Sequence, residues 1–318
     1  MKKSTVAAFA ALSIVGTALT GCGSEGAGAS GLTDISVGVL PSLESAPLFV
    51  GVDEGFFADE GLSLRIGSLA SGSAALIQPT VEGNYDVAVS DMLSLMRASV
   101  SGSELELIAP AGSSSGDAEA DFGALIVSGD SDVQSLNDLE GGFVGSNSLL
   151  DTNDTVLRAT MDAVGGISWT VQWREVAFQD AEKALDDGTV DAAFLVEPYL
   201  TRALNNGKRV LSYSYYDFDP NLDVGAYFTS ADFAAENPDV LERFTKALTK
   251  SIEFSNENPT KVRAIVTTYT QTQWNERITA ALPTYRTDFN AEAATKLATI
   301  AVKYLSLKHI PEFETFLP

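Results

Sequence analysis

The feature that most constrains the fold is an alternation, repeated twice, of short apolar runs with stretches whose apolar residues recur at helical spacing. Short apolar runs bounded by Gly, Pro or polar residues predict strands, and the stretches between them predict helices. Strands that alternate with helices are typical of βαβ units and of mainly parallel sheets. The 318 residues are enough for two domains of ordinary size with a deep cleft between them.

The first series predicts strands at residues 35–40, 62–66, 85–89 and 105–109, and helices at 46–57, 71–82 and 92–99. The second series begins near Gly123 and predicts strands at 124–127, 142–145 and 190–196, a helical turn at 135–139, and helices at 152–164 and 181–187. After a run at 225–229, the chain is expected to be almost entirely helical from Pro238 to Leu305.

The two series share one detail. Residues 76–89 read as a helix, a Gly turn and an apolar strand, and residues 184–196 repeat that order. In each, an Asp (Asp86 or Asp191) stands three residues after the Gly. Gly ends helices well, so such turns also occur by chance. Together with the two series, the repetition predicts two lobes of related design.

The first thirty residues differ from the rest of the chain. Lys2 and Lys3 precede a short stretch of small and apolar residues, which is the pattern of a secretory signal peptide. Leu-Thr-Gly-Cys at residues 19–22 resembles the bacterial lipobox, in which the cysteine is lipidated and becomes the first mature residue. We therefore expect a signal peptide at residues 1–21, lipidation of Cys22, and a flexible Gly/Ser/Ala tether at residues 22–31.

Charge and cysteine content limit the classes of function that the chain can have. The formal net charge is −23, and a surface this acidic repels phosphate backbones, which argues against nucleic-acid binding. Cys22 is the single cysteine, so no disulfide can form within the chain. No stretch after the signal segment approaches 18 apolar residues, so the mature chain is expected to be soluble apart from its lipid anchor.

The mature chain resembles the nitrate/sulfonate/taurine type of ABC-transporter substrate-binding protein, a group that includes thiamine-pyrimidine binders. The stretches that carry the resemblance follow family order over most of the chain: 37–41 (Val-Gly-Val-Leu-Pro), 45–50 (Ser-Ala-Pro-Leu-Phe-Val), 54–57 (Glu-Gly-Phe-Phe), 60–62 (Glu-Gly-Leu), 70–74 (Ala-Ser-Gly-Ser-Ala), 83–88 (Gly-Asn-Tyr-Asp-Val-Ala), 135–141 (Ser-Leu-Asn-Asp-Leu-Glu-Gly), 190–194 (Val-Asp-Ala-Ala-Phe), 197–199 (Glu-Pro-Tyr) and 236–240 (Glu-Asn-Pro-Asp-Val).

The resemblance implies an α/β, two-lobed fold of the type II periplasmic-binding-protein kind, with a mainly parallel sheet flanked by helices in each lobe and two hinge crossovers. Lobe one is expected to be residues 32–122 plus 225–318, and lobe two residues 123–224. The implied function is capture of a small molecule between the lobes and delivery to an ABC permease and ATPase. The chain is expected to be an exported, lipid-anchored monomer on the extracytoplasmic face of the membrane. A lipoprotein that feeds a sensor would have the same fold and remains the alternative.

In open parallel sheets, ligands bind beyond the carboxyl ends of the strands, which gives a location independent of the family. The polar residues predicted to stand there, and so to bind the ligand, are Ser42, Glu44, Ser71, Gly72, Ser73, Ser90, Asp91, Asp151, Thr152 and Glu197.

Several of these residues have a second interpretation. Residues 71–73 could simply cap the helix that follows, and Ser90 and Asp91 could cap the next one. Glu44 could be an ordinary exposed loop carboxylate. Glu197 ends a core strand, where an acid usually needs a partner, so it is expected to contact the cleft or pair at the hinge.

The expected ligand class follows from which residues are missing. None of the five strand-end segments contains Lys, Arg or His, although Arg commonly binds sulfonates and carboxylates. Glu44, Asp91, Asp151 and Glu197 favour a neutral or amine-bearing ligand over nitrate or an alkanesulfonate. Some tyrosines could provide a wall for stacking, although most are expected to be packing residues: Tyr199, Tyr213, Tyr215, Tyr216 and Tyr227.

An enzyme is the main rival to a binding protein. Some members of the wider superfamily use histidine and clustered cysteines, but this chain has only His309 and Cys22. We therefore expect no metal site, no cofactor and no catalytic residues. A hydrolase based on a pair of carboxylates stays open as an alternative, since 43 acidic residues always allow such a pair.

Overall fold

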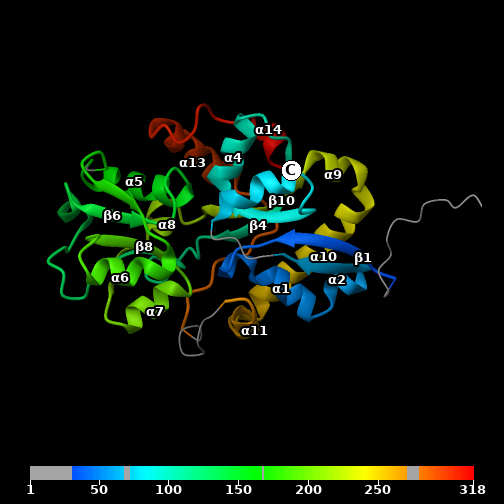
Figure 1. The fold of residues 1–318 in the computed structure, drawn as a ribbon, viewed down its shortest axis with the longest axis horizontal. Helices are drawn as coiled ribbons and strands as arrows, with labels where there is room; N and C mark the ends of the chain where they lie inside the picture. The colour runs from blue at the N-terminus through cyan, green and yellow to red at the C-terminus, as the bar shows by residue number, and fades with distance from the viewer. Residues whose placement is uncertain (1–30, 68–71, 167, 271–278) are drawn as a thin grey trace, which may run out of the picture.

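The computed structural model describes residues 31–67, 72–166, 168–270 and 279–318. Figure 1 shows two lobes side by side, each built around one five-stranded sheet with helices on both faces. The two-lobed α/β fold with flanking helices, predicted from the sequence, is confirmed. Within these ranges, no helix is long and apolar enough to cross a membrane.

The first sheet has the strand order β2-β1-β3-β10-β4. Its strands are β1 (Thr33–Gly38), β2 (Leu62–Ile66), β3 (Val87–Asp91), β4 (Leu105–Ser113) and β10 (Asp223–Ser230). β1 is parallel to β2 and β3, whereas β10 is antiparallel to both β3 and β4. Strand β10 thus lies between two strands that precede it by more than a hundred residues.

The second sheet repeats this plan with the order β7-β6-β8-β5-β9. Its strands are β5 (Gly123–Val127), β6 (Phe143–Ser146), β7 (Gln172–Glu175), β8 (Ala192–Val196) and β9 (Arg209–Ser212). β6 is parallel to β7 and β8, and β5 is antiparallel to β8 and β9. In each sheet the antiparallel strand is the first one after the chain crosses from the other lobe. The predicted boundaries fall at the start of β5 and inside β10.

The Gly and Asp repeat has the same structural role in both lobes. Gly83 and Gly188 adopt positive φ values of 77° and 70°, which end the preceding helix at little steric cost. Asp86 then accepts a hydrogen bond from Ser36 N in β1 at 2.6 Å, and Asp191 accepts one from Phe143 N in β6 at 2.7 Å. Each Asp therefore satisfies a backbone donor of the neighbouring parallel strand.

Helices cover both faces of each sheet. In the first half of the chain they are η1 (Leu43–Ser45), α1 (Ala46–Asp53), α2 (Phe56–Asp59), η2 (Ser73–Leu76), α3 (Ile77–Val81), α4 (Met92–Val100), η3 (Leu136–Leu139) and α5 (Thr152–Val164). The later ones are η4 (Phe178–Asp180), α6 (Ala181–Asp186), α7 (Tyr199–Asn205), α8 (Ser214–Phe218), α9 (Ala231–Glu236), α10 (Pro238–Glu257), α11 (Pro259–Ile265), η5 (Val266–Thr268), α13 (Ala291–Lys303) and α14 (Phe313–Phe316).

Alternation along the strands divides the core. In β8, Phe194 and Val196 point to one face and Leu195 to the other, as the two-residue period of a strand requires. One apolar cluster lies under α1, α10 and α11, and another lies under α6 and α7. The third is continuous through both lobes and includes α4, α5 and α13. The lobes therefore share one buried apolar region.

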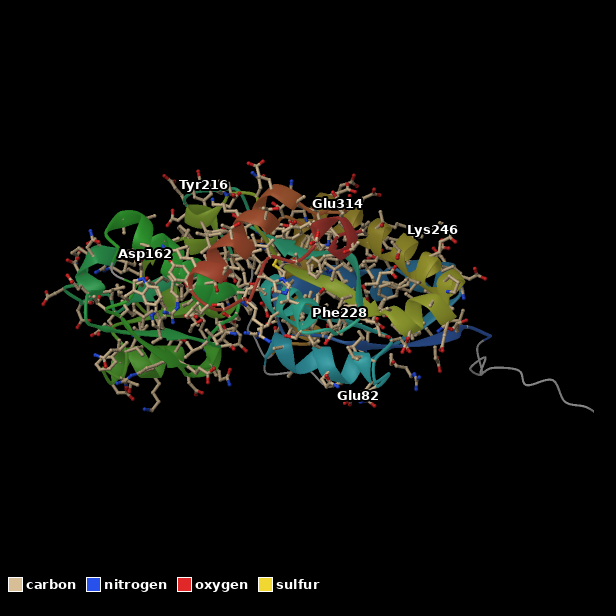
Figure 2. All side chains as sticks on the ribbon, turned by 90° about the horizontal axis from the view of Figure 1, so that it is seen from above. Glu82, Asp162, Tyr216, Phe228, Lys246 and Glu314 are labelled. Carbon is tan, nitrogen blue, oxygen red and sulfur yellow. The ribbon has the colours of Figure 1, made fainter. Side chains whose placement is uncertain are left out.

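Helix α13 strengthens this connection, because it packs against α4 of the first lobe and α5 of the second. Asp162, labelled in Figure 2, accepts hydrogen bonds from Lys303 Nζ at 2.9 Å and from the Tyr304 hydroxyl at 2.7 Å. These bonds hold the pKa of Asp162 below its usual range although its partial burial acts in the opposite direction. The C-terminal segment is thus attached to the second lobe as well as to the first.

Candidate functional site

A pocket lies between the lobes, at the carboxyl ends of strands from both sheets. Its empty volume is about 740 Å³, including space open to solvent. The residues that line it are Leu40, Pro41, Ser42, Glu44, Gly72, Asp91, Asn147, Asp151, Asn153, Ala177, Phe178, Gln179, Val196, Tyr199, Tyr215 and Val224. No Lys, Arg or His is among these described lining residues.

Glu44 lies in η1, just after β1, and is 8% exposed. Ser42 Oγ donates a hydrogen bond to its Oε2 at 3.1 Å. Within the described part of the chain, Oε1 has no hydrogen-bond partner. Burial, and to a lesser extent the negative charge of Asp91, raises the pKa of Glu44 from 4.5 to about 7. One oxygen of a buried carboxyl group is therefore left for the pocket.

Three buried tyrosines hold the backbone that presents Glu44. The hydroxyl of Tyr269 donates to Ser42 O at 3.0 Å, that of Tyr285 to Leu43 O at 2.9 Å, and that of Tyr227 to Glu44 O at 3.2 Å. Three successive carbonyl groups thus each accept a hydrogen bond from a different part of the chain. Such bonds restrict the loop and hold the Glu44 carboxylate at the pocket.

Asp91 and Asp151 stand at the N-termini of α4 and α5. Asp91 Oδ1 accepts from Ser94 N, and Asp151 Oδ1 accepts from Asp154 N, each at 2.9 Å. Both are therefore N-caps, which was the second interpretation of Asp91, and both also line the pocket. Burial, followed by repulsion from Asp91, raises the pKa of Asp151 well above its usual value.

The two helix N-termini are also joined to each other across the cleft. Thr152 donates to Asp91 Oδ1 from its backbone N at 3.2 Å and from its Oγ1 at 2.9 Å. The same Oγ1 accepts from Leu93 N at 3.1 Å. Nearby, Arg97 Nη1 donates to Leu150 O at 2.7 Å. Leu93 N and Ser94 N of α4, and Thr152 N and Asp154 N of α5, are thus bound to protein oxygens from one lobe or the other.

A chain of side-chain hydrogen bonds crosses the second lobe's side of the pocket. The Tyr215 hydroxyl donates to Asn153 Oδ1 at 2.6 Å, and Asn153 Nδ2 donates to Asn147 Oδ1 at 2.7 Å. In this arrangement the Nδ2 group of Asn147 has no hydrogen-bond acceptor among the described residues. Burial, with the charges of Glu44 and Asp151, raises the pKa of Tyr215 well above its usual value, so the hydroxyl stays a donor.

Aromatic rings form a further part of the lining. Phe178 and Tyr199 have ring centroids 5.8 Å apart. The Arg202 guanidinium lies 5.1 Å from the centroid of Tyr199, and its Nε pairs with Glu182 at 2.7 Å. The rings offer flat apolar surface to a ligand, and the charge of Arg202 is already balanced by an acid of its own lobe.

Glu197 is buried but does not line the pocket. Its Oε2 accepts from Thr201 N at 3.0 Å, and its Oε1 accepts from Thr201 Oγ1 at 2.8 Å and from Ala281 N at 3.1 Å. Burial raises its pKa to about 7 although these bonds and the nearby charge of Arg263 lower it. Glu197 thus joins the start of α7 to the segment after residue 279, and its expected role at the hinge stays a prediction.

The predicted site residues fall into three groups. Five line the pocket: Ser42, Glu44, Gly72, Asp91 and Asp151. Three do not: Glu197, Thr152 and Ser90. The Thr152 hydroxyl makes hydrogen bonds between the lobes, and Ser90 is a fully buried residue of β3. Ser71 and the side chain of Ser73 lie outside the described residues, and so does Cys22. A binding role for any of these residues stays a prediction.

The sequence interpretation missed part of the lining. Phe178 and Gln179 follow β7, whose sequence Gln-Trp-Arg-Glu lacks an apolar run and was not recognised as a strand. Asn153 stands inside the first turn of α5, and only its position next to the capping Asp151 could have indicated it. Among the described residues no group of three His, Cys, Asp or Glu side chains could hold a metal ion.

Comparison with solved structures finds the same fold. The ligand-binding component of an ABC-type import system from Staphylococcus aureus, with zinc bound, has a TM-score of 0.75 and 16% identity over 90% of this chain and 96% of its own. The aliphatic sulphonate-binding protein SsuA from Escherichia coli has a TM-score of 0.72 and 17% identity, over 90% and 97%. The nitrate-binding protein NrtA from Synechocystis has a TM-score of 0.67 and 13% identity, over 87% and 82%.

The sequence comparisons give a family as well as a fold. No curated protein sequence matches the chain. The family model described as NMT1/THI5 like matches residues 42–262, which is more than half of the chain and includes both halves of the pocket. Together with the resemblance recognised in the sequence, this match shows that the chain belongs to the NMT1/THI5-like family.

Proposed function

We propose that the chain is an exported, lipid-anchored binding protein that captures a small organic molecule between its lobes and delivers it to an ABC importer. The sulphonate- and nitrate-binding proteins among the similar structures support a binding role rather than an enzymatic one. The similar structures from Staphylococcus aureus and Escherichia coli are described as import-system and sulphonate-binding proteins, which supports the importer as partner and an extracytoplasmic location. Closure of two lobes around a ligand is a common mechanism for such proteins.

The proposed ligand is neutral or bears an amine, in contrast to the anions named for several similar structures. The observation that carries this proposal is the state of the helix N-termini at the cleft. Helix N-termini are ready-made anion sites because their first N–H groups are free. Here two carboxylates, of Asp91 and Asp151, and the hydroxyl of Thr152 already accept from several of these donors, so protein oxygens occupy the place that an anionic ligand would need.

A thermal-shift experiment tests the ligand class. The protein beginning at Ser24 is heated with a panel of nitrate, sulfonates and carboxylates, and with a panel of amines and nitrogen heterocycles. A ligand at about 100 times its Kd stabilises by roughly 2.7 kcal/mol, which raises the Tm of a protein this size by several degrees. We expect stabilisation from the second panel; stabilisation from anions alone would overturn the proposed ligand class.

A matched pair of variants locates the binding site. Phe178→Ala removes an aromatic ring from the pocket, and Phe313→Ala removes a half-buried ring from α14, away from the pocket. We expect the first variant to lose most of the stabilisation by the compound found in the panel, and the second to keep it. Equal loss in both variants would place the binding site elsewhere.

The importer and the anchor are tested in cells. Deleting the gene should abolish uptake of the compound; intact uptake with a lost cellular response would favour the sensor instead. The proposed lipid at Cys22 predicts a membrane-bound protein that takes up labelled fatty acid. A Cys22→Ala variant should be released from the membrane fraction, and membrane retention of that variant would contradict the anchor.

A further inference from the structure

The pocket concentrates acidic groups, and no Lys, Arg or His is among its described lining residues. Glu44, Asp91 and Asp151 all line it, and each is at least nine-tenths buried. Two bases of the adjoining helices make other contacts: Arg97 of α4 donates to Leu150 O, and Arg158 of α5 pairs with Asp154 at 2.9 Å. Three carboxylates that share one poorly solvated space repel one another, so the empty pocket favours retention of a proton.

Glu44 is the group whose hydrogen bonding leaves most room for a ligand. Its Oε2 accepts from Ser42 alone, and no described residue donates to its Oε1. By contrast, Asp91 and Asp151 each cap a helix. A buried carboxylate with an unpartnered oxygen is costly unless it is protonated or meets a cation.

The titratable groups around Glu44 reinforce this preference. Those that act on it, or on which its charge acts, come from β3, α8, β10 and the chain after η5, and they are Asp91, Tyr215, Tyr227, Tyr269 and Tyr285. None of these groups carries a positive charge at neutral pH. Burial also raises the pKa of Glu44 to about 7.

We propose that capture of a cationic ligand in this pocket expels a proton from its carboxyl cluster, with Glu44 as the group that gives up the proton. The inference rests on the proposed function and adds charge exchange to it. The positive nitrogen of the ligand replaces the proton at Glu44 Oε1, and the proton passes to solvent. Net charge inside the pocket is thereby conserved, so the negative charge of Glu44 is never left uncompensated.

Calorimetry with four cations tests the exchange: methylammonium, protonated ethanolamine, guanidinium and choline. All four stay charged between about pH 5.5 and 8, so any proton released comes from the protein. Binding of each is measured at a series of pH values, and at one pH in two buffers with different heats of ionisation. Buffer-dependent heat reports the number of protons released per cation bound.

We expect affinity for at least one cation to rise by up to about tenfold per pH unit below pH 7 and to level off above it. Glu44→Gln should bind more weakly, release no proton and show a flat pH profile. Ser42→Ala removes the bond that lowers the pKa of Glu44, so its profile should shift to higher pH. This second variant keeps the test valid if Glu44→Gln folds poorly.

The matched control is Asp121→Asn. Asp121 is fully buried, burial raises its pKa, and it lies outside the pocket lining. An Asn there can still accept from Ser115 N and Phe122 N through its oxygen and donate to Ser114 Oγ. The pH profile of cation binding should be unchanged, and a flattened profile would show that the proton comes from another group.

The outcomes separate this inference from the proposed function. Cation binding without proton release, or with a pH profile that Glu44→Gln leaves intact, would overturn the exchange but keep amine capture. Stabilisation by neutral heterocycles and by none of the four cations would overturn the exchange and keep a neutral ligand. Stabilisation by anions alone would overturn both.

Discussion

Glu44 and Glu197 are both buried, and in both burial raises the pKa to about 7, but their hydrogen bonding differs. Glu197 accepts three bonds from two parts of the chain, and both of its oxygens are used. Glu44 accepts one side-chain bond and keeps one oxygen for the pocket. A shifted pKa therefore does not by itself mark a candidate ligand-binding residue, and an unused acceptor next to a pocket is the more selective feature.

The largest effect should come from removing Glu197. Glu197→Ala leaves Thr201 N and Ala281 N without an acceptor in a buried place, so we expect a loss of about 4 kcal/mol in the free energy of unfolding. Urea denaturation measures it. Thr201→Ala, which removes one of the three bonds, should cost about 1 kcal/mol. If Glu197→Ala lowered the free energy of unfolding by less than Thr201→Ala does, the buried bonds of Glu197 would not stabilise the fold, and the contrast with Glu44 would be wrong.

Replacing Glu44 should stabilise the protein at high pH, whereas replacing Glu197 destabilises it. Its folded pKa of about 7 lies above the unfolded value of 4.5, so the native state binds more protons between these values. Stability from this group is therefore present below pH 4.5 and lost as the pH rises through 7. The shift corresponds to about 3 kcal/mol, so Glu44→Gln should be more stable than the wild type at pH 8 by up to about that amount.

The measurement is urea denaturation of the ligand-free protein at pH 5 and pH 8. We expect Glu44→Gln to remove part of the decline in stability between the two, and Glu82→Gln, a change at an exposed acid, to leave it as it is. An unchanged decline in Glu44→Gln would mean that Glu44 is ionised in the folded protein at much lower pH.

Contact between the lobes is tested by Thr152→Val. The substitution keeps the shape of the side chain but removes the hydroxyl that bonds Asp91 Oδ1 and Leu93 N, so we expect a loss of about 2 kcal/mol and a more open protein. Small-angle scattering should report a larger radius of gyration. Thr160→Val removes a bond within α5, to Leu157 O, and should leave the radius unchanged. Equal radii for the two variants would show that the hydroxyl does not hold the lobes together.

The smallest effect concerns the tyrosines behind Glu44. Tyr285→Phe removes the hydrogen bond to Leu43 O and should cost about 1 kcal/mol in unfolding. Its effect on cation affinity should be larger than that of Tyr216→Phe, a partly exposed tyrosine labelled in Figure 2. Calorimetry compares the two, and equal affinities would mean that the loop holds Glu44 without this bond.

Much of the fold could be predicted because strands buried on both faces have continuous apolar runs. The predicted bounds of β2 and α5 are those observed, and β3, β5, β6 and β8 differ by a few residues. Strand β7 was missed because Gln-Trp-Arg-Glu has neither such a run nor the alternation of apolar and polar residues that located the other edge strand, β2. The predicted helix at 46–57 is divided into α1 and α2 around Gly55, which has a φ of 79°.

The candidate site was less accessible to sequence reasoning. Strand ends located Ser42, Glu44, Asp91 and Asp151, because topology alone places them at one edge. Sequence could not distinguish Glu44 from Glu197, since that distinction depends on Ala281, 84 residues away from Glu197. Nor could it identify Tyr227, Tyr269 and Tyr285 as the residues that hold the Glu44 loop, because each lies more than 180 residues beyond it.

The position of β10 has a consequence for how the protein is made. The second sheet is complete once residue 212 has been synthesised, since all five of its strands come from one uninterrupted segment. In the first sheet, β4 pairs with β10 alone among the named strands, so it must wait for a strand that emerges more than a hundred residues later. We expect the second lobe to fold early on the nascent chain, and the first to close around it at the end of synthesis or export.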